Sequence, residues 1–299
     1  MPFPQGHPVI DLMFGIAVSE DNSEWYEGFK PLLMDEESRA LFKMPAQYMF
    51  KDIPRTPDVA DKDIAGKVAW TVAQMDRFNI RRVLTGFDER SEAVAEARRS
   101  YPDRFMFDLG INPNLGMEEV RRIRAAKRDH GIVALSYFPA ASHPQCPIND
   151  KRMYPIYATC VEEELPIFVN VGIPGPRIPF APQHVELVDE VCWFFPELKF
   201  VMRHGAEPWE ALAVKLMLKY PNLYYSPSAF APKHYPKAII NYMNSRGADK
   251  VLYSGYFPMG LSLDRIFSDF DELPLRDEVW PKFLYGNAAR LFGLDQGDA

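Results

Sequence analysis

The amino-acid sequence predicts an α/β protein built as one (β/α)8 TIM barrel over residues 1–299. Short apolar runs recur eight times, segments of helical periodicity separate them, and their spacing is even. Such near-continuous runs are typical of parallel strands that are buried on both faces. A doubly wound sheet is the alternative, but it has no obvious place for eight evenly spaced strands. The predicted strands are Val9–Phe14, Arg82–Phe87, Met106–Ile111, Ile132–Phe138, Pro166–Val171, Lys199–Arg203, Leu223–Ser226 and Lys250–Tyr253.

Between these strands, apolar residues follow the helical period, and capping residues mark several ends. Ser91 can cap a helix start, and Gly131 and Gly247 follow last turns. Tyr-Pro and Phe-Pro pairs stop other helices just before the next strand. The predicted helices are Asp61–Phe78, Ser91–Tyr101, Met117–Asp129, Asp150–Glu164, His184–Phe194, Trp209–Tyr220, Tyr235–Arg246, Leu263–Phe270 and Arg276–Phe292.

Composition and charge exclude several classes of partner. The chain is 47% hydrophobic, so it can bury a large core, and its net charge of −7 argues against a nucleic-acid surface or an anionic membrane. No apolar run approaches the roughly 18 residues of a membrane helix, and no signal peptide is recognisable at the N-terminus. Three cysteines without a CxxC spacing indicate reduced thiols in a cytoplasmic protein. Cys160 and Cys192 are expected in the core, whereas Cys146 is expected to be accessible in a Pro-rich loop.

In a barrel of this kind, chemistry takes place at the C-terminal ends of the strands. Long loops at 16–55, 139–147 and 172–182 are expected to cover this face, and the aromatic-rich first loop could serve as a lid, a homodimer contact or both. A small-molecule substrate is expected beneath them. The residues that we expect to contact it are Met13, Tyr137, Trp25, Tyr48 and Ser228.

Several segments in order along the chain resemble the amidohydrolase-2 branch of the amidohydrolase superfamily. They include Val9-Ile10-Asp11, the segment from Leu165 to Gly172, and the segment from Val201 to Trp209, which contains His204. The matches continue through 219–229 and 250–258 to the closing helix at 286–294. The resemblance covers nearly the whole chain and implies a barrel enzyme related to decarboxylases and lactone hydrolases.

The resemblance also implies a divalent metal, held by a His-x-His pair on the first strand, a His on the fifth and an Asp on the eighth. Here those four positions hold Met13, Gly15, Asn170 and Tyr256. A Met thioether and an Asn amide are weak ligands for hard divalent ions. We therefore expect no metal at the usual place and no other cofactor. A relocated metal that uses His204 with His143 or His184 is an alternative.

The His of the sixth strand persists as His204, and the resemblance implies that it carries a proton. A phenol at Tyr256 can donate a hydrogen bond or act as a general acid, and the Asn170 amide can hold an oxyanion. Asp11 is expected to be a framework carboxylate that orients Asn170 or a water. Arg203 is expected to face the barrel wall or its packing layer, because neighbouring strand residues point to opposite sides.

These assignments predict a metal-independent enzyme that acts on an aromatic or apolar substrate bearing a carboxylate or carbonyl group. A lyase of the decarboxylase or hydratase type is favoured over amide hydrolysis, because water attacks an amide poorly without a metal. An activated ester, lactone or thioester could still be hydrolysed. A catalytically silent barrel that binds a small molecule or a partner is the alternative from another class.

Overall fold

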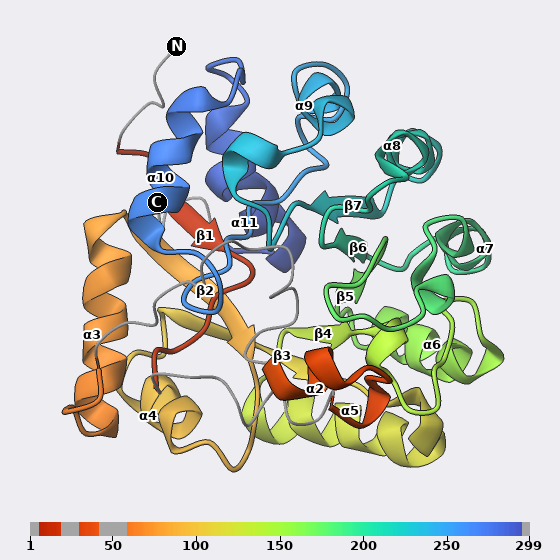
Figure 1. The fold of residues 1–299 in the computed structure, drawn as a ribbon, viewed down its shortest axis with the longest axis horizontal. Helices are drawn as coiled ribbons and strands as arrows, with labels where there is room; N and C mark the ends of the chain where they lie inside the picture. The colour runs from red at the N-terminus through yellow and green to blue at the C-terminus, as the bar shows by residue number, and fades with distance from the viewer. Residues whose placement is uncertain (1–5, 19–29, 42–58, 295–299) are drawn as a thin grey trace.

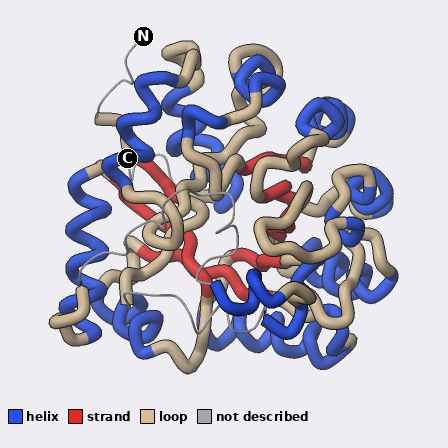
Figure 2. Tube along the Cα trace, viewed as in Figure 1, coloured by secondary structure: helices blue, strands red, loops and turns tan. Residues whose placement is uncertain are grey.

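Seven parallel strands follow one another around a curved sheet in chain order, with helices on the outside (Figures 1 and 2). The structure is a computed structural model, and it describes residues 6–18, 30–41 and 59–294. The strands coincide with the first seven apolar runs, so the predicted α/β barrel class is confirmed. They are β1 (Val9–Asp11), β2 (Ile80–Gly86), β3 (Phe105–Gly110), β4 (Ala134–Tyr137), β5 (Ile167–Asn170), β6 (Phe200–Arg203) and β7 (Leu223–Ser226).

The predicted eighth strand bridges the two edges of this sheet. Tyr225 of β7 donates its N–H to the Lys250 carbonyl (3.0 Å) and accepts from the Leu252 N–H (2.8 Å). On the other side, Leu12 donates its N–H to the Tyr253 carbonyl at 3.2 Å. These bonds satisfy backbone groups of both edges, as a barrel requires. Segment 250–253 therefore takes the eighth place.

Helices cover the outer face of the sheet, and each predicted helical segment contains one (Figure 1). The last segment differs in detail, because a π-helical turn at Lys282–Gly286 precedes its α-helix. The helices are α2 (Glu36–Leu41), α3 (Ile64–Arg77), α4 (Glu92–Ser100), α5 (Met117–His130), α6 (Tyr154–Glu162), α7 (Leu187–Phe194), α8 (Glu210–Lys219), α9 (Lys237–Met243), α10 (Leu263–Asp269) and α11 (Asn287–Phe292). No helix in the described part of the chain is long and apolar enough to cross a bilayer.

Alternation along the strands separates two apolar layers. The larger layer lies between strands and helices and includes Phe200 and Met202 of β6. The smaller layer fills the barrel interior, where Val201 of β6 meets Phe168 of β5 and Leu12. Because successive side chains point to opposite faces, residues 170 and 203 fall on the same inner face as Phe168 and Val201.

The three long loops meet over the C-terminal ends of the strands. Leu33, in the described part of the first loop, is fully buried and packs with Ala140 and Ile178 of the other two. Arg177 forms ion pairs with Asp35 (3.1 Å) and Glu37 (3.0 Å) at the start of α2. This contact supports the prediction that the first loop covers the C-terminal ends of the strands. Residues 19–29 and 42–58 of that loop lie outside the described residues.

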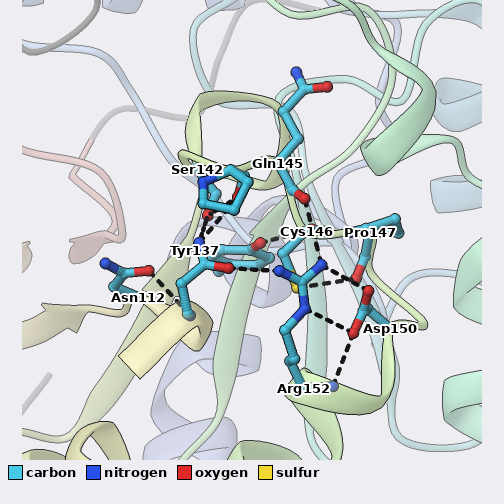
Figure 3. A network of polar contacts seen from close by, with 10 residues as sticks. Asn112, Tyr137, Ser142, Gln145, Cys146, Pro147, Asp150 and Arg152 are labelled. Atoms are coloured by element: carbon cyan, nitrogen blue, oxygen red, sulfur yellow. Dashed lines mark hydrogen bonds and ion pairs between the residues drawn. The ribbon is translucent and has the colours of Figure 1, made fainter. Parts of the chain in front are cut away.

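The expectation of an accessible Cys146 is wrong. All three cysteines are buried, and Cys146 has no exposed surface. Its loop folds back on β4, where the Tyr137 hydroxyl donates a hydrogen bond to the Cys146 carbonyl at 2.6 Å (Figure 3). Composition marks this segment as a loop, but only its packing decides that the thiol is covered.

Candidate active site

The position of His204 depends on an unusual backbone conformation directly after β6. Residues 204, 205 and 206 have φ angles of 69°, 87° and 58°, which is the left-handed region. Such angles cost about 1–2 kcal/mol for a residue with a Cβ. Strict alternation would turn His204 away from the inner face. The left-handed turn brings its ring to Ser228 and Tyr256 instead.

A close approach between two loops supports this turn. A Cβ added at Gly172 would lie 2.8 Å from the Ala206 carbonyl carbon and from the Glu207 backbone. Gly172 also has a φ of 92°, and the Ile173 N–H donates to the Glu207 carbonyl at 2.9 Å. Glycine is therefore required at 172 for both space and conformation.

His204 forms its polar contacts with Ser228, which follows β7. The His204 backbone N–H donates to the Ser228 hydroxyl oxygen at 3.3 Å, and that hydroxyl lies 3.0 Å from ring Nδ1. Nδ1 also lies 3.4 Å from the Ser228 carbonyl oxygen, which can only accept a hydrogen bond. The contact with the carbonyl is a hydrogen bond in the neutral tautomer with the ring proton on Nδ1, and that tautomer leaves Nε2 available as an acceptor.

The surroundings of His204 oppose a charged imidazole. Burial and then the positive charge of Arg203 lower its pKa to about 3, against a raising effect of the Ser228 carbonyl. The residue retains some exposed surface, and a smaller shift in the same direction would still leave it neutral at pH 7.

Tyr256, after the eighth strand, faces His204 edge-on, with ring centroids 6.1 Å apart and an interplanar angle of 89°. Tyr256 is only 9% exposed. Burial raises its pKa to about 12, although the Arg203 charge acts in the opposite direction. The phenol therefore keeps its proton and can serve as a hydrogen-bond donor.

Asp11 holds the backbone beside Tyr256. Its Oδ1 accepts the N–H of Gly255 at 2.8 Å and that of Met13 at 3.0 Å. The side chain is fully buried, and burial raises its pKa to about 7 despite these donors and the nearby Tyr253 hydroxyl. The hydrogen bonds of Asp11 are to backbone N–H groups and not to Asn170, while its predicted role in orienting a water stays a prediction.

Arg203 and Asn170 are neighbours across β6 and β5 on the inner face. Both are 7% exposed. The Arg203 guanidinium lies 4.9 Å above the Phe168 ring centre, and its Nη2 reaches the Leu12 carbonyl only at 3.5 Å. The expectation that Arg203 faces the barrel wall or its packing layer is therefore wrong. Its side chain lies on the inner face, above Phe168, and extends across the interior at the C-terminal ends of the strands.

Asp108, near the end of β3, is a buried charged residue that was not among the predicted site residues. It is 5% exposed, and its negative charge acts on Arg203. Met106 lies in the inner layer, and residues two apart on a strand share a face, so the strand pattern could have placed Asp108 on the inner face.

The remaining predicted substrate contacts do not gather here. Tyr137 is 3% exposed in the outer layer, and its hydroxyl is engaged by the Cys146 carbonyl (Figure 3). Met13 is partly buried against the same layer. Trp25 and Tyr48 lie outside the described residues. The structure therefore brings together His204, Ser228 and Tyr256 beside the inner-face pair of Arg203 and Asn170.

The residues at the four implied ligand positions do not fit a metal. Gly15 has no side chain, and a Cβ there would lie 2.9 Å from Pro258 Cδ, so a His could not be accommodated without a shift. Among the described residues, no group of three or more His, Cys, Asp or Glu side chains is arranged so that it could hold a metal ion. His184, considered for a relocated site, accepts the Glu186 N–H at Nδ1 (3.2 Å) and packs on Trp209.

A barrel with polar side chains gathered at its strand C-termini defines the class of protein, an α/β barrel with an enzyme-like site. A family model described as Amidohydrolase matches residues 38–294. The chain therefore belongs to the amidohydrolase family, and it is an amidohydrolase-related enzyme. No curated protein sequence matches the chain.

Solved structures with the same fold span nearly the whole chain. An uncharacterized TIM-barrel protein from Bordetella bronchiseptica is 22% identical, with a TM-score of 0.73, and the match covers 96% of this chain and 99% of the other. A dihydroxybenzoic acid decarboxylase from Polaromonas, with bound manganese and an inhibitor, is 16% identical (TM-score 0.62, coverage 98% and 99%). A 4-oxalomesaconate hydratase from Rhodopseudomonas palustris is 15% identical (TM-score 0.61, coverage 97% and 97%).

Proposed function

We propose that the protein is a metal-independent lyase that acts on an aromatic or otherwise apolar substrate bearing a carboxylate or carbonyl group. The observation that carries the proposal is the grouping of His204, Ser228 and Tyr256 at a barrel mouth whose metal-ligand positions hold unsuitable residues. Solved relatives in the fold include a decarboxylase and a hydratase, which are both lyases. The decarboxylase holds manganese, whereas the residues at the four implied ligand positions of the present chain do not suit a metal.

Each residue has a role that matches its chemistry. The protonated phenol of Tyr256 and the amide N–H of Asn170 donate hydrogen bonds to a substrate oxygen and stabilise developing negative charge. His204 is the proton carrier. Its neutral ring is ready to accept a proton, from water in a hydration or from a substrate group. Ser228 fixes the ring orientation, and Asp11 holds the backbone that presents Tyr256.

The proposal is tested by turnover with protein that has been treated with chelator and assayed for metal. Aromatic acids, unsaturated acids, lactones and acyl thioesters are screened by product analysis. We expect turnover of a carboxylate or carbonyl substrate with far less than one metal ion per chain. Tyr256→Phe and His204→Asn should each lower kcat/KM by about 100-fold or more, the usual contribution of such groups.

Matched substitutions elsewhere control for general damage. Tyr154→Phe removes a surface hydroxyl bonded to Glu190 on α7, and His234→Asn changes a histidine outside the site. Both should retain wild-type turnover. One metal ion per chain that is required for turnover would contradict the proposal. A folded protein without turnover on any substrate would favour the silent binding barrel.

A further inference from the structure

The guanidinium of Arg203 is buried at the C-terminal ends of the strands. Within the described part of the chain it forms no ion pair, and its Nε has no hydrogen-bond acceptor. Its single hydrogen bond is the long one to the Leu12 carbonyl at 3.5 Å. A guanidinium has five N–H donors, so most of its capacity is unused.

Its neighbours form an incomplete polar site. Asn170 lies directly across the sheet from Arg203, and its side chain is 7% exposed on the same inner face. The titratable groups around the pair are Asp108, His204 and Tyr256. The negative charge of Asp108 acts on Arg203 from a distance, but the two side chains form no ion pair, so Asp108 does not occupy the guanidinium donors.

An unpaired buried charge is costly, and native proteins rarely retain one without a reason. A planar guanidinium fork matches a carboxylate through two parallel hydrogen bonds, which makes arginine the usual residue for recognising such groups. The Phe168 ring supports its underside, so the fork is held in place before a ligand arrives.

We propose that Arg203 and Asn170 form an anion-binding subsite that holds a carboxylate of the substrate inside the barrel mouth. This inference rests on the proposed function and narrows it, because it selects an organic acid over a neutral ester or lactone. Arg203 then supplies a fixed positive charge at a mouth whose residues do not suit a metal.

Carboxylate binding has a consequence for His204. The Arg203 charge is one of the two causes that lower the pKa of that ring. A bound carboxylate would offset this charge, which acts in the direction of a higher pKa for His204.

The test is equilibrium binding, measured by titration calorimetry of the full chain. The probes are benzoate and hexanoate, with benzamide as a neutral analogue of benzoate. Wild type should bind at least one of the two acids saturably and benzamide at least about tenfold more weakly, as expected for losing a charged hydrogen-bonded pair. Arg203→Met should lose about tenfold or more in affinity, and Arg203→Lys should lose less. Arg77→Met, at an exposed arginine paired with Asp264, should bind like wild type.

Folding of the variants is followed by thermal unfolding. Because Arg203 is buried and unpaired, Arg203→Met should have a Tm equal to or above that of wild type without ligand. Equal affinity of wild type and Arg203→Met, equal affinity for benzoate and benzamide, or no saturable binding of either acid would overturn the inference. Turnover that is insensitive to Arg203→Met would remove the subsite and leave the lyase proposal standing. Carboxylate binding that depends on Arg203, without turnover of any substrate, would support the subsite and contradict the lyase proposal.

Discussion

Asp11 is a fully buried carboxyl group whose ionisation should weaken the fold at neutral pH. The backbone N–H groups of Gly255 and Met13 and the nearby Tyr253 hydroxyl favour its charged form, but they do not compensate for burial, which raises its pKa to about 7. In Asp11→Asn the amide oxygen can keep both bonds, while the group no longer ionises. We therefore expect the substitution to stabilise the protein above pH 7 and to have little effect near pH 4.

The size and sign of the effect of Asp11→Asn on the free energy of unfolding follow from proton linkage. The folded pKa lies above the ordinary value of 3.8, so the folded state binds more protons between about pH 4 and pH 7. The contribution of Asp11 is fully present below about pH 4 and is lost as the pH rises through 7. The difference between 3.8 and about 7 corresponds to about 4 kcal/mol of free energy of unfolding at high pH.

The assay is urea unfolding followed by tryptophan fluorescence at pH 5, 6, 7 and 8. The free energy of unfolding of Asp11→Asn minus that of wild type should increase from pH 5 to pH 7 and level off toward pH 8, because the folded pKa is about 7. Asp61→Asn, at an exposed carboxylate, serves as the control and should show no such trend. A constant or decreasing difference would refute the account of Asp11 as a buried carboxyl with a raised pKa.

Three further outcomes are expected. Gly172→Ala should lower the free energy of unfolding by about 2 kcal/mol or more, measured by urea unfolding, because its φ is 92° and a Cβ would meet the Glu207 backbone; Gly110→Ala, with its nearest neighbour at 3.9 Å, should lose less. All three cysteines are buried, so a thiol reagent should label less than one per native chain and all three in urea; rapid native labelling would contradict their burial. With a substrate in hand, kcat/KM should show no titration of His204 or Tyr256 between about pH 5 and pH 10, because kcat/KM reports the free enzyme; a limb near pH 6.5 that disappears in His204→Asn would contradict the lowered pKa.

The order of the elements followed from the sequence. Continuous apolar runs and capped helical segments depend on local periodicity, so β1–β7 and their helices coincide with the predicted segments. The identity of the residues at the ligand positions is also visible in the chain itself. Residues 13, 15, 170 and 256 lack the donors that the resemblance implies, whatever their geometry.

The environments of individual side chains could not be predicted from the sequence in the same way, because contacts between distant segments create them. Tyr137 follows the strand rule, yet its hydroxyl is engaged by the Cys146 carbonyl in the outer layer. Asp11 reaches Gly255, which is 244 residues away in the chain. Such partners leave no periodic signal in a sequence.

The barrel, its family resemblance and the unsuitable metal-ligand positions could be recognised from the sequence, since each is expressed in residue type and order. Only the tertiary structure decided which polar groups share the barrel mouth. The left-handed backbone at His204 turns its ring toward Ser228 and Tyr256, and strand alternation leaves Arg203 buried above Phe168 without an anion. The physical reason is that burial and charge depend on how the strands close around the interior.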